Sequence, residues 1–243
     1  MHLESATMAE KLFTDKDYLL EQMHDLFKHI PPLQHQQVLE SMSLYRFKKD
    51  DLIFVEGSAC NESMYLIDGI VKVYQSGIAD RDQILRIIGS GEFFGYEASL
   101  IGNTIHSTRA AAMDNSLICF FPMETMMELA NSNLAVANTY ITSLARSIAH
   151  SDMMTINLTQ NHVRGRLAKA LLVVSTQRGA LEDDGKTIRY RISRKDLADI
   201  GNMTTNNAIR TLSSFADEGI VELIGRKIKI LDFDKLTDIS NVE

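Results

Sequence analysis

The sequence predicts an α+β protein in which an antiparallel β jelly roll is followed by a long helix and a winged helix-turn-helix. Three observations predict this fold class. Short β-rich runs separated by turns occupy residues 46–122, where seven of the chain's 13 glycines lie between Gly57 and Gly102. Residues 123–160 contain neither glycine nor proline. Two capped helical patterns and a pair of short strands follow within residues 161–243.

The composition is that of a globular chain of one large or two small domains. The 243 residues are 45% hydrophobic and 23% charged, which excludes bulk disorder. No run approaches the roughly 18 apolar residues of a membrane helix, and the first residues do not resemble a secretory signal. Two cysteines, Cys60 and Cys119, cannot build a disulfide framework or a four-thiolate metal site. We therefore expect a cytoplasmic protein with reduced thiols and no membrane partner.

Charge is distributed unevenly along the chain. The net charge is −7, but residues 1–160 hold 11 basic and 20 acidic side chains, whereas residues 161–243 hold 14 and 12. The first part therefore has a net charge of −9 and the second a net charge of +2. A nearly neutral module joined to an acidic one can contact nucleic acid with one end of the molecule.

The first predicted domain, residues 1–122, combines N-terminal helices with the jelly roll. Apolar residues recur every three or four positions until Pro31-Pro32, and a second helix is expected over about residues 33–44. Asp68-Gly69 between two apolar runs is a strong hairpin signal. The spacing of the β-rich runs favours a sandwich or barrel, with strands expected at residues 51–55, 63–67, 70–74, 84–88 and 117–121.

The second predicted segment is one long helix over residues 123–160. Apolar residues alternate at spacings of three and four, which favours a two-helix dimer seam over packing against the chain's own domain. The predicted dimer interface consists of Leu134, Ile141, Leu144 and Ile148. The same register places Ser151 and Thr155 on the seam.

The third predicted domain, residues 161–243, contains two short helices joined by a tight turn. Ser193 and Asp196 form a capping box that starts a helix ending near Ile200. Thr204 is a good N-cap for a second helix ending near Asp217. Strands at 220–224 and 227–231 would form the wing, and the helices would be held together by Leu197, Ile209, Leu212 and Phe215.

A helix-turn-helix places its second helix in the major groove of double-stranded DNA, where the N-terminal side chains reach base edges. The alternative is an ordinary helical hairpin whose polar residues face water. Asn pairs well with adenine, Arg with guanine, and Arg or Lys with phosphates. The predicted DNA-binding residues are Arg194, Lys195, Thr204, Thr205, Asn206, Asn207, Arg210, Arg226 and Lys227.

Three stretches together resemble the CRP/FNR family of bacterial transcription regulators: FKKDDLIFVEGSACNESMYLIDGIVKVY, GSGEFFGYEASLIGN and ISRKDLADIGNMTTNNAIRTLSSFADEGIVEL. The resemblance extends over about residues 20–238. It implies a cyclic-nucleotide-binding-like jelly roll, a homodimer, sequence-specific binding to DNA, and RNA polymerase as a partner. It also implies allosteric control by an effector held between the jelly roll and the long helix, without enzymatic activity.

The family's cyclic-nucleotide binders use a glutamate for the ribose and an arginine for the phosphate. The resemblance places Tyr96 at the glutamate position and His106 at the arginine position. Glu97 comes one residue late, and Arg109 lies three residues beyond His106, on the opposite face of a strand. We therefore expect no tight binding of cyclic AMP and leave the effector unidentified. The candidate effector residues are Gly95, Tyr96, Glu97, His106, Ser107, Thr108, His150, Ser151 and Thr155.

Other functions fit the sequence less well. No cysteine precedes Cys60 and the histidines lack ligand spacing, so neither an iron–sulfur cluster nor haem is expected. A cupin-type enzyme needs two or three histidines, and residues 46–122 hold only His106, so no catalytic or metal-binding residues are assigned. A cyclic-nucleotide module without DNA function would leave residues 161–243 unexplained. A cyclic-nucleotide-responsive regulator and a ligand-independent regulator controlled by abundance or a partner remain alternatives.

Overall fold

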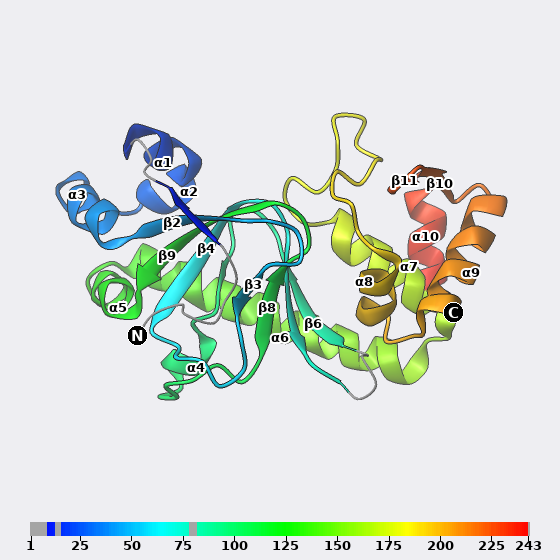
Figure 1. The fold of residues 1–243 in the computed structure, drawn as a ribbon, viewed down its shortest axis with the longest axis horizontal. Helices are drawn as coiled ribbons and strands as arrows, with labels where there is room; N and C mark the ends of the chain where they lie inside the picture. The colour runs from blue at the N-terminus through cyan, green and yellow to red at the C-terminus, as the bar shows by residue number, and fades with distance from the viewer. Residues whose placement is uncertain (1–8, 13–15, 78–81, 243) are drawn as a thin grey trace. The chain divides into compact units, whose positions relative to one another are not determined.

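The computed structural model describes residues 9–12, 16–77 and 82–242, with the backbone alone for residues 157–160. The chain divides into two compact units, Met1–Val71 with Ile88–Ser147, and Lys72–Ile87 with Ile148–Glu243. Figure 1 shows the elements of each unit.

Short strands predominate in the first half of the chain and helices in the second. The elements up to residue 88 are β1 Glu10–Leu12, α1 Lys16–Gln22, α2 His24–Phe27, α3 Pro32–Ser41, β2 Ser43–Phe47, β3 Leu52–Phe54, β4 Glu62–Asp68, β5 Val71–Gln75 and β6 Gln83–Ile88. Those that follow are β7 Phe93–Phe94, α4 Glu97–Leu100, β8 Arg109–Ala112, β9 Ser116–Pro122, α5 Met123–Ser132, α6 Leu134–Gln160, α7 Val163–Ser175, α8 Arg194–Ile200, α9 Thr205–Asp217, β10 Val221–Ile224, β11 Lys227–Ile230 and α10 Phe233–Val242.

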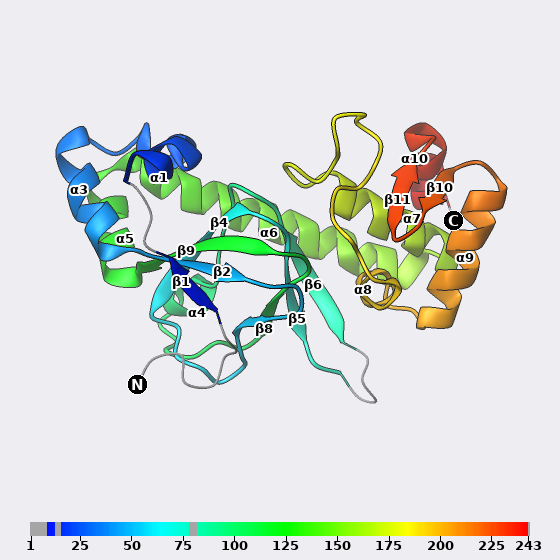
Figure 2. The ribbon, with the colours of Figure 1, turned by 45° about the horizontal axis from the view of Figure 1, so that its top comes forward.

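The predicted β-rich domain is confirmed as two sheets of short strands. Within the described residues, one sheet has the order β1-β2-β9-β4-β7 and another the order β3-β8-β5-β6. Figure 2 shows β1, β2, β9 and β4 side by side. Strand β9 pairs antiparallel with both β2 and β4, so that Met64 lies opposite Phe120. Apolar side chains of this sheet face the N-terminal helices, α5 and the start of α6, which together form one hydrophobic core.

The Asp68-Gly69 turn between β4 and β5 requires glycine. Gly69 has φ +114°, and a Cβ there would lie 2.4 Å from Ser116 Oγ and 2.7 Å from Ser116 Cα. Both values are shorter than any normal contact between these atoms. The hairpin predicted at Asp68-Gly69 is nevertheless wrong, because β4 pairs with β9 and β7 while β5 belongs to the other sheet. The turn carries the chain from one sheet to the other, and the close approach of Ser116 explains the glycine there.

Two predicted helical segments are wrong in detail. Residues 43–47 form strand β2 rather than the end of a helix, because Leu44 and Phe47 enter the core while the strand pairs with β9. Residues 123–160 form two helices rather than one, with a break at Asn133. The Asn133 backbone is extended (φ −137°, ψ 105°), and its Oδ1 accepts a hydrogen bond of 3.0 Å from the Ala135 N–H. Asn133 therefore caps α6 and also donates to the carbonyl of His29.

The helices of the second unit pack around α7. Helices α8, α9 and α10 all contact α7, and α9 leads into the β10–β11 hairpin (Figure 1). Strands β10 and β11 pair antiparallel, with Val221 opposite Ile230. This arrangement is the predicted winged helix-turn-helix.

The cap at Asn133 generates a test of the break between α5 and α6. Asn133→Ala removes the acceptor for the first turn of α6, and we expect the free energy of unfolding to fall by about 1 kcal/mol. Asn131→Ala makes the same change at an exposed helical position and serves as the control. Urea unfolding measures both variants. Equal stability of the two variants would show that Asn133 does not cap the helix.

Candidate nucleic-acid interface and effector site

Both helices of the helix-turn-helix begin at the predicted caps. Ser193 Oγ accepts a hydrogen bond of 2.9 Å from the Asp196 N–H, and α8 starts at the next residue after Ser193. Thr204 Oγ1 accepts one of 3.2 Å from the Asn207 N–H at the start of α9. A Cβ on Gly201 would lie 2.6 Å from Met203 Cε, so the turn between the helices is tightly packed. The capping pattern therefore fixes where the second helix presents its first turn.

Helix α9 has one buried and one exposed face. Ala208, Leu212 and Phe215 are at most 1% exposed. The exposed residues recur one turn apart on the other side and consist of Thr205, Asn206, Ile209, Arg210 and Ser213. This confirms the packing predicted for Leu212 and Phe215, but the core assignment of Ile209 is wrong, since its side chain is 44% exposed. Two turns of α9 thus present a continuous surface.

The predicted phosphate-binding residues differ in whether a carboxylate already pairs with their positive charge. Lys195 Nζ contacts Asp199 Oδ2 at 2.9 Å and Asp82 Oδ2 at 3.2 Å. Lys227 forms an ion pair with Glu182. Arg210 and Arg226 are exposed, and no described residue pairs with either. The sequence could not reveal these three carboxylate partners, because Asp82 and Glu182 come from distant segments and Asp199 stands at an ordinary helical spacing from Lys195.

The other predicted DNA-binding residues are less uniform. Thr205 and Asn206 are exposed on α9, and Asn207 is half-buried. The hydroxyl of Thr204 serves as the cap. Arg194 is half-buried at the start of α8, and burial lowers the pKa of its guanidinium.

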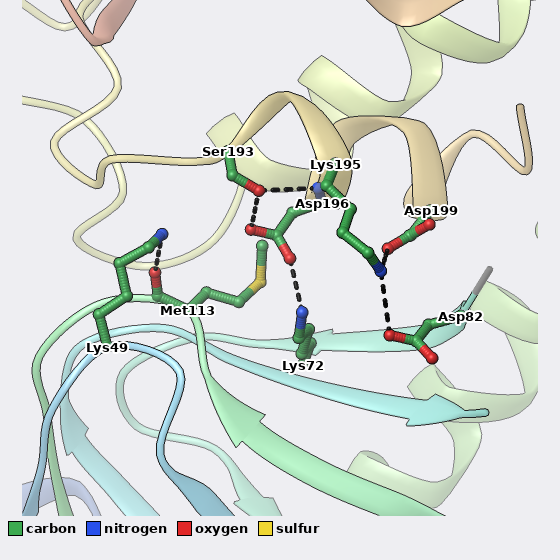
Figure 3. A network of polar contacts seen from close by, with 8 residues as sticks. All are labelled: Lys49, Lys72, Asp82, Met113, Ser193, Lys195, Asp196 and Asp199. Atoms are coloured by element: carbon green, nitrogen blue, oxygen red, sulfur yellow. Dashed lines mark hydrogen bonds and ion pairs between the residues drawn. The ribbon is translucent and has the colours of Figure 1, made fainter. Parts of the chain in front are cut away.

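A network of ion pairs joins α8 to strand β5 and to Asp82 within the second unit (Figure 3). Lys72 Nζ lies 2.6 Å from Asp196 Oδ1, and both side chains are at least nine-tenths buried. Ser193 Oγ donates to Asp196 Oδ2 at 2.5 Å. Burial lowers the pKa of Lys195, but its hydrogen bonds to Asp199 and Asp82 and the charges of these carboxylates together raise the pKa by more. The net shift of the Lys195 pKa is therefore upward. The first helix of the motif is therefore anchored by charge as well as by packing.

The far end of α9 is held by an ion pair with α7. Arg164 Nη1 and Nη2 contact the two carboxylate oxygens of Glu218 at 2.6 and 2.8 Å, and the guanidinium lies 4.9 Å from the ring centre of Phe215. Hydrogen bonds from Arg164 and then Ser214 lower the pKa of Glu218 to about 2. This two-point contact keeps the helix oriented on its support.

Helix α6 carries an exposed apolar stripe. Leu134, Ile141 and Ile148 are 75%, 59% and 63% exposed and lie seven residues apart. Such spacing is that of one coiled-coil position. Leu144, which the sequence assigned to the same seam, instead packs against the core of the first unit, since it lies on the side of the helix that faces that core. The stripe is the predicted dimer surface without Leu144.

In the candidate effector site, Tyr96 belongs to the core. Its side chain is fully buried, and its ring meets that of Tyr140 edge-on at 4.7 Å. Tyr140 reaches back to Ser63, with 2.9 Å between the two hydroxyl oxygens, and burial raises its pKa well above the usual range. The aromatic contact joins the turn before α4 to α6. Tyr96 therefore couples these two elements through packing rather than through charge.

His106 is also buried, at 4% exposed, and stacks on Phe54 with 3.9 Å between ring centres. Burial lowers its pKa, against a weaker upward effect of Glu97, so the ring is neutral at pH 7. Its backbone forms two hydrogen bonds of 2.8 Å with Gly57 and Ser58. Ser107 is exposed and Thr108 half-buried. A neutral stacked ring cannot replace the positive charge of an arginine.

Cys60 contacts the turn that contains Gly95. Its thiol is buried and donates to the Gly95 carbonyl at 3.2 Å, in the turn that precedes α4. Gly95 has φ +77°, and a Cβ there would lie 3.1 Å from Met64 Sδ. Burial raises the pKa of Cys60 and, to about 12, that of Cys119, so both are thiols at neutral pH. A lone cysteine in a loop gives no sequence signal for such a contact.

The remaining candidate effector residues belong to the second unit. Burial lowers the pKa of His150, as do the charges of Arg86 and Lys169, so this ring is neutral. Ser151 and Thr155 are exposed on α6, and Thr155 Oγ1 donates to the Ser151 carbonyl at 2.9 Å. The structure thus gathers Gly95, Tyr96, Glu97, His106, Ser107 and Thr108 in one unit and His150, Ser151 and Thr155 in the other.

Neither a metal-binding group nor a membrane-spanning helix is found within the residues that the structure describes. No three His, Cys, Asp or Glu side chains among them are grouped so that they could hold a metal ion. No helix within the described part of the chain is long and apolar enough to cross a membrane.

Comparisons with known proteins agree with this geometry. Residues 44–133 match the cyclic nucleotide-binding domain and residues 165–239 match the Crp-like helix-turn-helix domain. The chain is 23% identical to the fumarate and nitrate reduction regulatory protein of Escherichia coli over 94% of this chain and 85% of that protein. It is 23% identical to the CRP-like cAMP-activated global transcriptional regulator of Mycobacterium tuberculosis, over 87% and 94%. The fold is similar to that of FixK2 from Bradyrhizobium japonicum, with a TM-score of 0.72, 21% identity, and coverage of 82% and 96%.

The buried pair in Figure 3 generates a stability prediction. Lys72→Met removes the cation from the buried Asp196 carboxylate, and breaking such pairs costs about 3–5 kcal/mol. We expect the second unit to unfold at lower urea concentration. The double variant Lys72→Met/Asp196→Asn should recover part of the loss, because it no longer buries a charge. If the single variant is as stable as wild type, the pair does not hold α8.

The exposed stripe of α6 generates a prediction about assembly. Ile148→Glu would bring two like charges together at an apolar interface, which costs several kcal/mol. Sedimentation should give a dimer for wild type and a monomer for this variant. Arg146→Glu, which adds a carboxylate on a different side of α6, should stay dimeric. A wild-type monomer at micromolar concentration would contradict the seam.

Proposed function

The chain belongs to the CRP/FNR family of transcription regulators, a non-enzymatic family, and we propose how its own residues perform that role. In this proposal the cytoplasmic homodimer binds two-fold symmetric DNA, responds to an effector through its β-rich domain, and acts on RNA polymerase. The observation that carries the proposal is the exposed face of α9. The helix is capped by Thr204, held by the Arg164–Glu218 ion pair and packed on an apolar core. Its exposed face presents side chains that can hydrogen-bond to base edges.

The proposed division of labour on DNA follows from charge and exposure. Arg210 and Asn206 have the donor geometry for guanine and adenine, respectively. Arg226 in the wing suits a phosphate, because its charge is exposed and no described residue pairs with it. Lys195 and Lys227 would contact phosphates only by exchanging a carboxylate for a phosphate oxygen. Binding through them would therefore displace Asp82, Asp199 or Glu182.

The proposed assembly explains why α6 exposes its apolar stripe. Two copies joined along Leu134, Ile141 and Ile148 would present two recognition helices to successive major grooves, about 34 Å apart. An effector that binds one arrangement of the dimer more tightly would shift the population towards the DNA-binding arrangement. Ser151 and Thr155 continue the stripe with polar groups.

We propose that the effector is not recognised by a cyclic-nucleotide charge clamp. The observations that support this are the burial of Tyr96 in an aromatic cluster and the neutral, stacked state of His106. A cyclic phosphate would have to be bound without an arginine at that position. A regulator without an effector, controlled by its own abundance or by a partner, is the alternative that shares these features.

Selection from random DNA tests the proposed interface. We expect a two-fold symmetric motif. Arg210→Ala should relax discrimination at one base pair of each half-site, by roughly 1–3 kcal/mol per contact. Arg226→Ala should instead weaken all sequences similarly and reduce the salt slope by about one unit. The proposal fails if wild type selects no symmetric motif.

Calorimetry at neutral pH tests the absence of a charge clamp. We expect no tight binding of cyclic AMP or cyclic GMP, because a neutral His106 gives no compensation for the phosphate charge. The cAMP-activated regulator of Mycobacterium tuberculosis provides the positive control. A dissociation constant in the low micromolar range would show that Glu97 or Arg109 supplies the missing contacts.

A further inference from the structure

The exposed face of α9 contains one large apolar side chain among polar ones. Ile209 is 44% exposed, follows Thr205 by four residues and Asn206 by three, and directly precedes Arg210. Single exposed apolar residues are common on protein surfaces. This one, however, lies inside the surface that would face the bases, whereas the buried face of the helix is already complete without it.

The buried face of α9 is filled by residues other than Ile209. Ala208, Leu212 and Phe215 fill the interface with the other helices and are at most 1% exposed. Ile209 follows Ala208 by one residue, a turn of about 100° towards the exposed side. Isoleucine also favours helix less than alanine does. Neither helix propensity nor burial therefore accounts for isoleucine at this position.

The major groove offers one apolar group at the base edges, the 5-methyl group of thymine. We propose that Ile209 is a specificity-determining residue that packs against a thymine methyl in each half-site, next to the base contacted by Arg210 or Asn206. This proposal rests on the proposed binding of DNA through α9. It adds an apolar requirement to a face whose other members offer hydrogen bonds.

The side chain is suited to this contact. A β-branched residue in a helix has one strongly preferred χ1 rotamer, so little side-chain entropy is lost when a methyl group packs against it. The cap at Thr204 and the Arg164–Glu218 pair hold the helix that carries it. The contact therefore discriminates by shape and by the removal of apolar surface from water.

The test replaces thymines of the selected DNA site one at a time by deoxyuridine, which removes the methyl group and keeps the base pair. For the wild-type dimer we expect one thymine per half-site at which the replacement weakens binding roughly three- to five-fold, the effect of one buried methyl group. Ile209→Ala should weaken binding to the thymine site and should no longer distinguish thymine from deoxyuridine there. Its melting temperature should match wild type, since the side chain is exposed.

Two control variants make the result specific to Ile209. Ser213→Ala changes the same face and should keep the full sensitivity to deoxyuridine. Thr205→Ser removes the other methyl group of the face without removing its hydroxyl, and should also keep it. Loss of the sensitivity in Thr205→Ser, or its survival in Ile209→Ala, would overturn the inference.

The same experiment separates this inference from the proposed function. If no symmetric site is selected, DNA recognition by α9 itself is wrong. If a site is selected but no thymine shows methyl dependence, the DNA-binding role stands and the role of Ile209 is refuted.

Discussion

The second unit depends on the buried carboxylate of Asp196. Burying a charge is costly unless its lone pairs are satisfied, and here Lys72 and Ser193 supply the partners at 2.6 and 2.5 Å. The backbone N–H of the same residue is capped by Ser193. One side chain and one amide thus specify where α8 begins, and the cap at Thr204 specifies where α9 begins. The orientation of the exposed face of α9 follows from these bonds together with the packing of its own buried face.

Local chemistry explains which parts of the fold were predictable. Caps at Ser193 and Thr204 and the apolar repeats depend on residues a few positions apart, so the sequence displays them directly. The turn at Asp68-Gly69 is also local, but the hairpin expected there is not formed, because β4 and β5 pair with strands from distant parts of the chain. The break at Asn133 was missed because asparagine inside a helical pattern is an ordinary residue until its backbone becomes extended. Strand β2 was missed because five residues between a helix and a strand carry too short a pattern to distinguish the two.

The sites were less predictable than the fold, because their chemistry depends on long-range partners. The residues near Lys195 in the sequence do not indicate its ion pair with Asp82, and those near Lys227 do not indicate its ion pair with Glu182. Ile209 looked like a core residue because apolar character usually predicts burial, and only the orientation of α9 shows otherwise. For Tyr96 and His106 the residue types led us to expect no charge clamp, and the aromatic packing around them could be seen only in the structure.

The exposed stripe on α6 has a consequence for how steeply the regulator responds to its own concentration. In the proposed homodimer, Leu134, Ile141 and Ile148 are buried only when two chains pair, so the stability of that surface would depend on chain concentration. Below the dissociation constant for pairing, the amount of dimer rises with the square of the chain concentration. Doubling the number of chains in the cell would then quadruple the species that reaches both half-sites. Synthesis and degradation of the protein would therefore act as an amplified input, in addition to any small molecule.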